Sequence, residues 1–237
     1  MIRALAFSFV LLGCRPSDPE EDSSPRDTAD SAREDTAVTD TQDSGDSGEP
    51  CDPPRYEPDP FVDAVVSFTP GTGAGFGQED MPGIVLGPPQ GGGATAGSEH
   101  VLTLGEGGEI VLEFLEFVLI DGPGTDLLVF ENPFPGWVEP GVVSASEDGS
   151  SWVSWDCESD NPADGYPGCA GVKAALSHPD NCIDATDPDT AGGDAYDLAE
   201  IGLESARFVR IADAGVSGAG GFDLDAVAIV NGVGQDD

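Results

Sequence analysis

The chain has very little positive charge. Its 237 residues contain 46 aspartates and glutamates but only 8 lysines and arginines, which gives a formal net charge of −38. The imbalance is not confined to one end, because residues 61–237 alone carry 31 acids against three bases, a net charge of −28. Nucleic acids and anionic lipid surfaces bind through basic patches, so this composition argues against both as partners. A packed domain with this charge needs well-solvated surface acids or bound cations.

Long hydrophobic runs are also missing. The N-terminal run from Ala4 to Leu12 is shorter than the roughly 20 residues that span a bilayer, and it follows a single positive charge. This pattern is typical of the hydrophobic region of a signal peptide. The ending LLGC resembles the bacterial lipobox, which implies a signal peptide over 1–13 and a lipid-modified Cys14. With Arg15 behind it, the resemblance implies the outer membrane or cell surface. A plain secretion signal cleaved elsewhere is the alternative.

Large aliphatic side chains are almost absent from residues 15–60. Val38 is the only aliphatic residue larger than alanine there, among many Ser, Thr, Asp, Glu and Pro residues. Such a segment cannot bury enough apolar surface to offset its ordering entropy, so we expect residues 14–60 to be a disordered acidic linker. Residues 61–237 are long enough for one domain with a single core.

Cysteine is scarce but informative. If Cys14 carries lipid, four cysteines remain in an exported chain, and an even number predicts two disulfides with three possible connectivities. Cys157 and Cys169 flank a short loop and form the obvious local pair, which leaves Cys51 with Cys182. The chain has no CxxC pair, so a zinc site is the weaker interpretation.

Clear helical patterns are lacking, apart from one plausible turn at 197–206. Short runs rich in β-branched and aromatic residues recur instead, separated by Gly, Pro and Asp clusters. These predicted strands are residues 61–69, 100–104, 109–120, 126–131, 141–147, 151–157, 206–213 and 222–230. An Asp-Gly turn between the fifth and sixth runs predicts a hairpin, in which we expect Trp152 to face the core. Many short strands without helices indicate an all-β sandwich or barrel.

Three segments resemble a known fold family. The hairpin VVSASEDGSSWVSW, the strand ARFVRIAD and the closing strand FDLDAVAIV are similar to the galactose-binding-like jelly roll of discoidin and carbohydrate-binding modules. The segments DGPGTDLLVFENPF, GGDAYDL and GFDLDAVAIVNG also resemble bacterial cell-surface lipoproteins of unassigned function. The resemblance covers most of 61–233 and implies a β-sandwich at the cell surface. It does not imply an activity.

The closing strand poses an electrostatic problem. Alternation along a strand places Phe222, Leu224, Ala226 and Ala228 on one face, and Asp223, Asp225, Val227 and Ile229 on the other. Two like charges on a half-apolar face cost free energy unless something compensates them. The resemblance implies an answer, because many galactose-binding-like modules hold a structural Ca²⁺ with an aspartate of the last strand among its ligands.

Calcium is therefore the expected cofactor. It binds six to eight hard oxygens, and Asp-Gly segments supply both carboxylates and accessible carbonyls. The candidate ligands are Asp223, Asp225, Asp121, Asp126 and Asp194, with Glu131 as a further strand-end acid. The plainer interpretation is ordinary turn chemistry and solvated loops.

The remaining polar and aromatic residues have mainly structural interpretations. Trp137 and Tyr166 lie in Pro/Gly loops, where exposed rings stack on sugars or cover the core edge. His100 and His178 have no nucleophile signature near them. The sequence thus predicts a surface-anchored, calcium-stabilised module that is not an enzyme and that binds a glycan or surface polymer. The alternatives are a carboxylate-dependent glycan hydrolase and a structural envelope protein.

Overall fold

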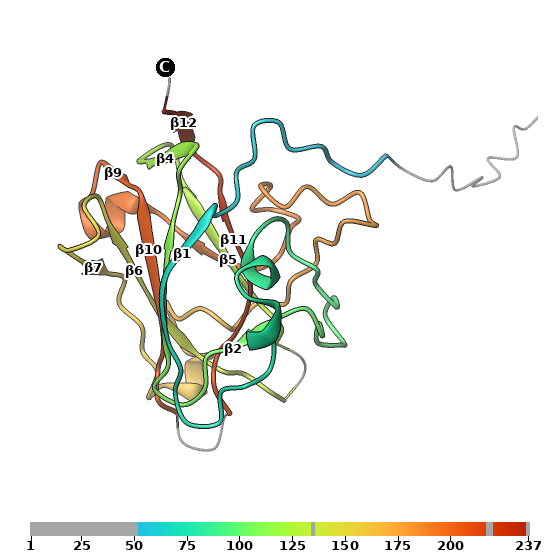
Figure 1. The fold of residues 1–237 in the computed structure, drawn as a ribbon. Helices are drawn as coiled ribbons and strands as arrows, with labels where there is room; N and C mark the ends of the chain where they lie inside the picture. The colour runs from blue at the N-terminus through green and yellow to red at the C-terminus, as the bar shows by residue number, and fades with distance from the viewer. Residues whose placement is uncertain (1–51, 134–135, 217–219, 236–237) are drawn as a thin grey trace, which may run out of the picture. The chain divides into compact units, whose positions relative to one another are not determined.

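The computed structural model describes residues 52–133, 136–216 and 220–235. The predicted signal peptide, Cys14, Cys51 and most of the acidic linker lie outside these residues. The described part contains strands and 3₁₀ turns but no α-helix. None of its helical segments has the length and apolar composition needed to cross a bilayer. Short extended runs between Gly- and Pro-rich turns thus fold as the sequence indicates (Figure 1).

The strands are β1 (Ala64–Thr69), β2 (Leu102–Thr103), β3 (Glu109–Glu113), β4 (Phe117–Ile120), β5 (Leu127–Glu131), β6 (Gly141–Ser146), β7 (Val153–Ser154), β8 (Asp194–Tyr196), β9 (Ser205–Ala206), β10 (Phe208–Asp213), β11 (Asp223–Ile229) and β12 (Gly232–Gly234). The 3₁₀ turns are η1 (Gln78–Asp80), η2 (Gly83–Val85), η3 (Pro162–Asp164) and η4 (Leu198–Ile201). The turn η4 falls within the one helical segment that the sequence indicates.

The strands form three antiparallel sheets that make a β-sandwich. A five-stranded sheet has the order β1-β3-β10-β6-β7, and a four-stranded sheet has the order β2-β11-β5-β8. A small third sheet, β12-β4-β9, completes the fold. Side chains from both larger sheets meet in one apolar cluster, such as Leu112 of β3 and Val129 of β5. Alternating residues on facing strands therefore build the core, as expected of a sandwich.

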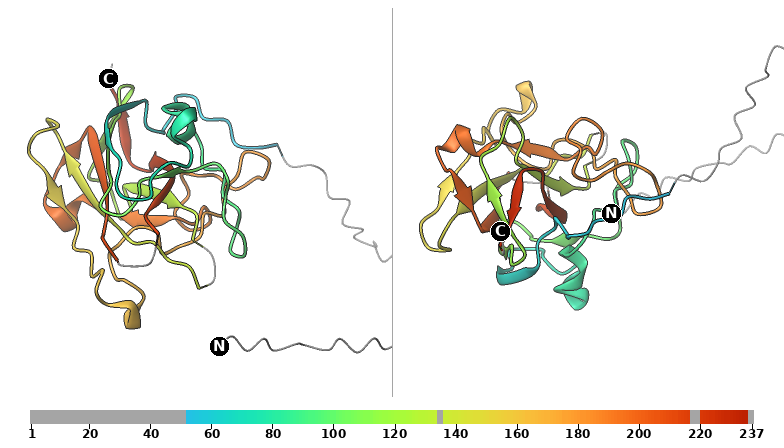
Figure 2. Two further views of the ribbon diagram at one scale, coloured as in Figure 1. Left: turned by 60° about the horizontal axis from the view of Figure 1, so that its bottom comes forward. Right: turned by 90° about the horizontal axis from the view of Figure 1, so that it is seen from above.

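The central strands β11 and β5 of the four-stranded sheet are buried on both faces. Every residue of β5 is buried. Its outward side chains Leu128 and Phe130 pack in a second cluster with alanines from the loop before β8 and with Phe61. The loops between β1 and β2 and between β7 and β8 lie outside the sheets, and η3 projects from the molecule (Figure 2). Long loops thus cover the outer face of this sheet.

For β11, the prediction of which side chains share a face of the sheet is wrong after Asp225. The pairing of β11 with β5 shifts by one residue between Leu224 and Ala226, so Asp225 is the extra residue of a β-bulge. Ala226 and Ala228 consequently belong to the outer cluster. The residues of this segment that pack between the main sheets are Phe222, Leu224, Val227 and Ile229.

Two other predictions need correction. The run 109–120 is two strands, because the chain turns where the Asp63 carboxylate accepts hydrogen bonds from the Leu115 and Glu116 amides. The Asp-Gly hairpin is confirmed as β6 and β7, but Trp152 is only half-buried and lies against the Arg210 guanidinium, 4.8 Å from the ring centroid. The core tryptophan is Trp155, because the hairpin register turns that ring inward.

Candidate metal centre and its surroundings

Three acidic side chains meet at one end of the β5–β11 pair. Glu131 is the last residue of β5, Asp223 is the first residue of β11, and Glu139 lies in the loop before β6. One carboxylate oxygen from each lies within 4.8 Å of the other two. Antiparallel pairing forces the first two together, because Leu224 sits opposite Glu131. We call these three residues the acidic triad.

Burial makes the acidic triad electrostatically costly. Glu131 is 1% exposed and Glu139 is 4% exposed. Burial raises the pKa of Glu131 well above its usual value, and repulsion from Asp223 and Glu139 adds to the increase. Burial, with repulsion from Asp223, also raises the pKa of Glu139 to about 7. The pKa of Asp223 is raised by burial as well. Each carboxylate is therefore harder to ionise here than in water.

The triad has fewer hydrogen-bond donors than acceptor oxygens. The Gly221 amide donates to Glu139 Oε1 at 3.0 Å. Thr103 provides a hydrogen bond that partly lowers the pKa of Asp223, and hydrogen bonds from the Asn132 and Asp223 backbone partly lower that of Glu131. Among the described residues, Glu131 Oε2 and Asp223 Oδ1 are buried and have no hydrogen-bond partner. Most buried polar atoms are paired, so two orphaned oxygens in one group require an explanation.

The backbone at Gly220 lies close to the side chain of Glu139 in the triad. Gly220 has a φ of 113°, in the region that favours glycine, and a Cβ at this position would clash with Glu139 Oε1. The exposed Trp137 lies on the same side, and its side chain hydrogen-bonds to Glu139. The predicted ligand-binding residue Trp137 is thus at the border of the acidic triad.

A second acidic group contains Asp121, Asp126 and Asp197, whose ligand oxygens also lie within 4.8 Å of one another. Its central member, Asp126, is fully buried but well paired. One of its oxygens accepts hydrogen bonds from the Gly122 amide and Asn231 Nδ2, and the other accepts one from the Leu198 amide. Asp197 caps η4 through the Ala199 amide. Hydrogen bonds alone account for this arrangement.

The other two predicted ligands belong to neither group. Asp194 accepts hydrogen bonds from the Val172 and Lys173 amides, and burial raises its pKa to about 6. Both Asp225 oxygens lie 3.0 Å from the Gln90 amide, and burial raises the pKa of Asp225 to about 7. The structure therefore distributes the five predicted aspartates over four places, and it does not bring Asp225 to Asp223.

Glu139 is the member of the acidic triad that the sequence does not predict. Glu139 is a single acid in the Pro/Gly-rich segment 132–140, and no spacing rule connects it to the closing strand. Glu131 was detectable as an acid at the end of a predicted strand. Only the pairing of β5 with β11 brings that acid beside Asp223.

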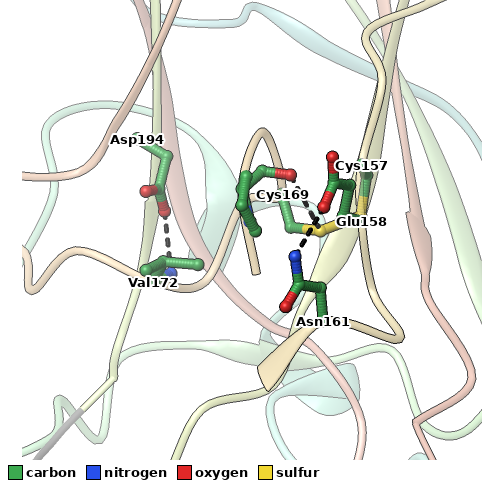
Figure 3. The surroundings of a disulfide bond; sticks show 7 residues. Cys157, Glu158, Asn161, Cys169, Val172 and Asp194 are labelled. Atoms are coloured by element: carbon green, nitrogen blue, oxygen red, sulfur yellow. Dashed lines mark hydrogen bonds between the residues drawn. A yellow bond between two sulfur atoms is a disulfide. The ribbon is translucent and has the colours of Figure 1, made fainter. Parts of the chain in front are cut away.

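The local disulfide is confirmed. Cys157 and Cys169 are bonded, with Cα atoms 4.5 Å apart, and they close the loop that carries η3 (Figure 3). Asn161 stabilises this loop by donating hydrogen bonds from Nδ2 to Glu158 and Asp164. The loop therefore has a fixed base at the disulfide and an internal polar network.

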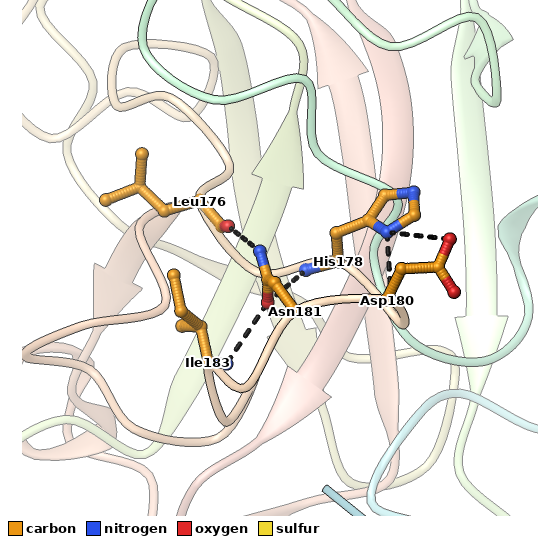
Figure 4. Close-up of polar contacts among 5 residues, drawn as sticks. All are labelled: Leu176, His178, Asp180, Asn181 and Ile183. Atoms are coloured by element: carbon orange, nitrogen blue, oxygen red, sulfur yellow. Dashed lines mark hydrogen bonds and ion pairs between the residues drawn. The ribbon is translucent and has the colours of Figure 1, made fainter. Parts of the chain in front are cut away.

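Cys182 lies in a loop organised by Asn181. Asn181 Nδ2 donates to the Leu176 carbonyl, and its Oδ1 accepts from the His178 and Ile183 amides (Figure 4). Cys182 is itself disulfide-bonded, and its Sγ lies 3.5 Å from the Asp52 carbonyl oxygen. Cys51 lies outside the described residues, so the Cys51–Cys182 pairing stays a prediction.

Tyr166, the second predicted aromatic ligand, lies in the disulfide loop and has a φ of 56°. It lines a hollow of about 230 Å³ beside Lys173 and Asp194. A neighbouring cleft of about 490 Å³ lies between β7 and β8. Tyr166 and Trp137 thus lie on different structural features.

Comparisons with known proteins add little. No protein-family model matches the chain, and no curated protein matches it. Among solved structures, the chain is similar to the C-terminal domain of a chitobiase from Bacteroides fragilis, with 15% sequence identity. The match covers 72% of this chain and 93% of that chain, with a TM-score of 0.33. At this TM-score the likeness carries no argument about function.

Proposed function

We propose that the chain is a lipid-anchored, exported binding module whose β-sandwich is stabilised by a divalent cation, calcium, at the acidic triad. The main support for a cation is that Glu131 Oε2 and Asp223 Oδ1 are buried oxygens with no hydrogen-bond partner among the described residues. A cation supplies the positive charge and the coordination that these oxygens lack. Glu131, Glu139 and Asp223 would hold it, and calcium suits a group made only of hard oxygens.

Basic side chains are poor alternatives to a cation. Arg207 lies 3.6 Å from Glu113, and Arg210 lies 3.8 Å from Glu109. Lys173 lines the hollow beside Asp194. Residues 61–237 contain no other lysine or arginine. The other way to neutralise the triad is protonation, and the pKa of about 7 at Glu139 means that a proton competes with the cation already near neutral pH.

A thermal melt of residues 50–237 tests the cation. We expect the melting temperature to rise from EDTA to millimolar Ca²⁺ at fixed ionic strength, which keeps screening constant. Binding to the folded state alone stabilises by about 2.7 kcal/mol when calcium is at 100 times its Kd. Mg²⁺ should give a smaller rise, because it prefers strict octahedral sites.

Two matched variants make this test specific. Glu131→Gln removes one buried charge, so in EDTA it should be at least as stable as the wild type but insensitive to calcium. Asp225→Asn removes a buried acid outside the triad, so it should retain the calcium response. Identical wild-type melts in EDTA and Ca²⁺, or loss of the response in Asp225→Asn alone, would contradict the proposed site.

The geometry of the triad does not favour the hydrolase alternative. Glycan hydrolysis uses two carboxylates about 5–10 Å apart on either side of an accessible sugar. Glu131 and Glu139 are 1% and 4% exposed, so a sugar ring cannot pass between them. The triad is better suited to holding an ion than to binding a substrate.

A further inference from the structure

The sandwich has an open side beside the disulfide. There a cleft of about 490 Å³ lies between β7, an edge strand of the five-stranded sheet, and β8, an edge strand of the four-stranded sheet. The hollow of about 230 Å³ shares Gly168, Ala195 and Tyr196 with this cleft. The two hollows therefore form one trough that crosses β8, with a volume in the range of small-molecule sites.

The larger hollow of the trough is mainly polar and lies over two buried rings. Trp155 and Tyr196 line it with ring centroids 4.9 Å apart, and both rings are almost fully buried. Asp156 and Glu200 are exposed at the rim of the larger hollow. Ala195, which is exposed, lies where the two hollows meet. Carboxylates at the rim are acceptors for hydroxyl groups, and the half-buried Tyr166 of the smaller hollow can contact a sugar ring.

The walls of the trough are fixed before any ligand binds. The Cys157–Cys169 disulfide holds the loop that contains Gly168, which lines both hollows. Trp155 Nε1 donates to the Asp197 carbonyl at 2.9 Å, which connects this buried ring to the start of η4. Asp197 in turn caps η4, which supplies the opposite rim. A preformed site costs little ordering entropy on binding.

We infer that this trough binds a neutral oligosaccharide, an inference that rests on the proposed role of the chain as a binding module. Lys173 is the one basic residue of the lining, and it lies beside the buried Asp194. An anionic polymer would be repelled by Asp156 and Glu200 and by the charge of −28 on residues 61–237. An extended peptide would have to pair with β7 or β8, but these strands have two and three residues. Such short edges offer little backbone for strand addition. A sugar chain needs only hydroxyl acceptors and ring contacts.

The test is calorimetric titration with cellohexaose, maltohexaose and chitohexaose, in saturating calcium. We expect at least one of these neutral hexasaccharides to bind. Ala195→Tyr fills the meeting point of the hollows and should weaken binding at least about tenfold. The matched control is Ala199→Tyr, which adds the same ring at an exposed position of η4 outside the lining. Its affinity should stay within about twofold of the wild type, and melts check that both variants fold.

Three outcomes would overturn the inference. These are no binding of any hexasaccharide to the wild type, equal binding by Ala195→Tyr, and binding of a neutral Ser-Ala repeat peptide that Ala195→Tyr abolishes while no sugar binds. The calcium melts test the cation site independently of the sugar titrations. If calcium stabilises the protein but no sugar binds, the trough assignment is wrong and the cation site stands. If a sugar binds but calcium does not change the melting temperature, the cation site is wrong and the trough assignment stands.

Discussion

Individual carboxylates in this protein have different surroundings despite similar burial. Asp126 is fully buried and accepts hydrogen bonds from two backbone amides and one side-chain amide. Glu131 is equally buried, but its Oε2 has no partner among the described residues. The cost of burying a charge depends on such pairing. This difference is the reason that we propose the cation site at the acidic triad rather than at the Asp126 group.

The raised pKa of Asp225 predicts an unusual pH dependence of stability. Burial raises this pKa to about 7, and the Gln90 amide offsets the increase only in part. The folded state thus binds the proton more tightly than the unfolded state, whose aspartates titrate near pH 3.9. The stabilising effect of that proton is complete below about pH 4 and is lost as the pH rises through about 7.

We therefore expect the free energy of unfolding in saturating calcium to fall between pH 5 and pH 8, by on the order of 1–3 kcal/mol. Asp225→Asn should flatten this dependence, because the amide oxygen can still accept the Gln90 hydrogen bond while the charge is gone. Urea titrations across this pH range measure the effect. A slope that is unchanged in Asp225→Asn would refute the assignment.

At the scale of elements, the sequence predicted strands well where hydrophobic runs were long enough. The runs 126–131 and 141–147 became β5 and β6 almost unchanged. By contrast, β8 has three residues, and it is a strand only because it pairs with β5. The bulge at Asp225 involves the Gln90 amide, 135 residues away in the chain, so no local pattern could indicate it. Both β8 and the bulge depend on contacts between residues that are far apart in the chain, which a local sequence pattern does not contain.

The disulfide loop gives a prediction at this scale. Cys157→Ala combined with Cys169→Ala removes a cross-link that closes a loop with a sequence separation of 12. Chain entropy predicts a loss of about 2–3 kcal/mol in the free energy of unfolding. Denaturant titration of the double variant measures this loss without disturbing the disulfide of Cys182. Unchanged stability would mean that the loop is held by its polar contacts alone.

At the scale of the whole molecule, the acidic composition fits a domain held away from a membrane rather than laid on it. If residues 15–60 form a random coil, their root-mean-square end-to-end distance would be roughly 35–40 Å. Repulsion among the acidic side chains would extend the linker further. The net charge of −28 on residues 61–237 would oppose contact with anionic lipids. The proposed anchor therefore has to come from the N-terminal lipid and not from the domain surface.

Cys14→Ser tests the anchor directly. We expect the variant to leave the membrane fraction and appear in the periplasm or medium, because it lacks the residue that would carry lipid. Cys51→Ser is the matched control, since it changes another cysteine of the same region and should stay with the membrane. A wild-type chain that is already soluble, and lipid-free by mass spectrometry, would show that the lipobox resemblance is misleading.

The attachment of the N-terminal segment to the domain has a mechanical consequence. The Tyr56 hydroxyl accepts a hydrogen bond from the Ala185 amide, and the Pro60 carbonyl accepts one from the Ile229 amide of β11. Phe61 packs in the cluster that covers the outer face of the four-stranded sheet. A pulling force on this segment would therefore load the covering loop and β11 before it reached β1, the next strand along the chain. Tension on this segment would thus be transmitted to the strand that begins with Asp223 of the acidic triad.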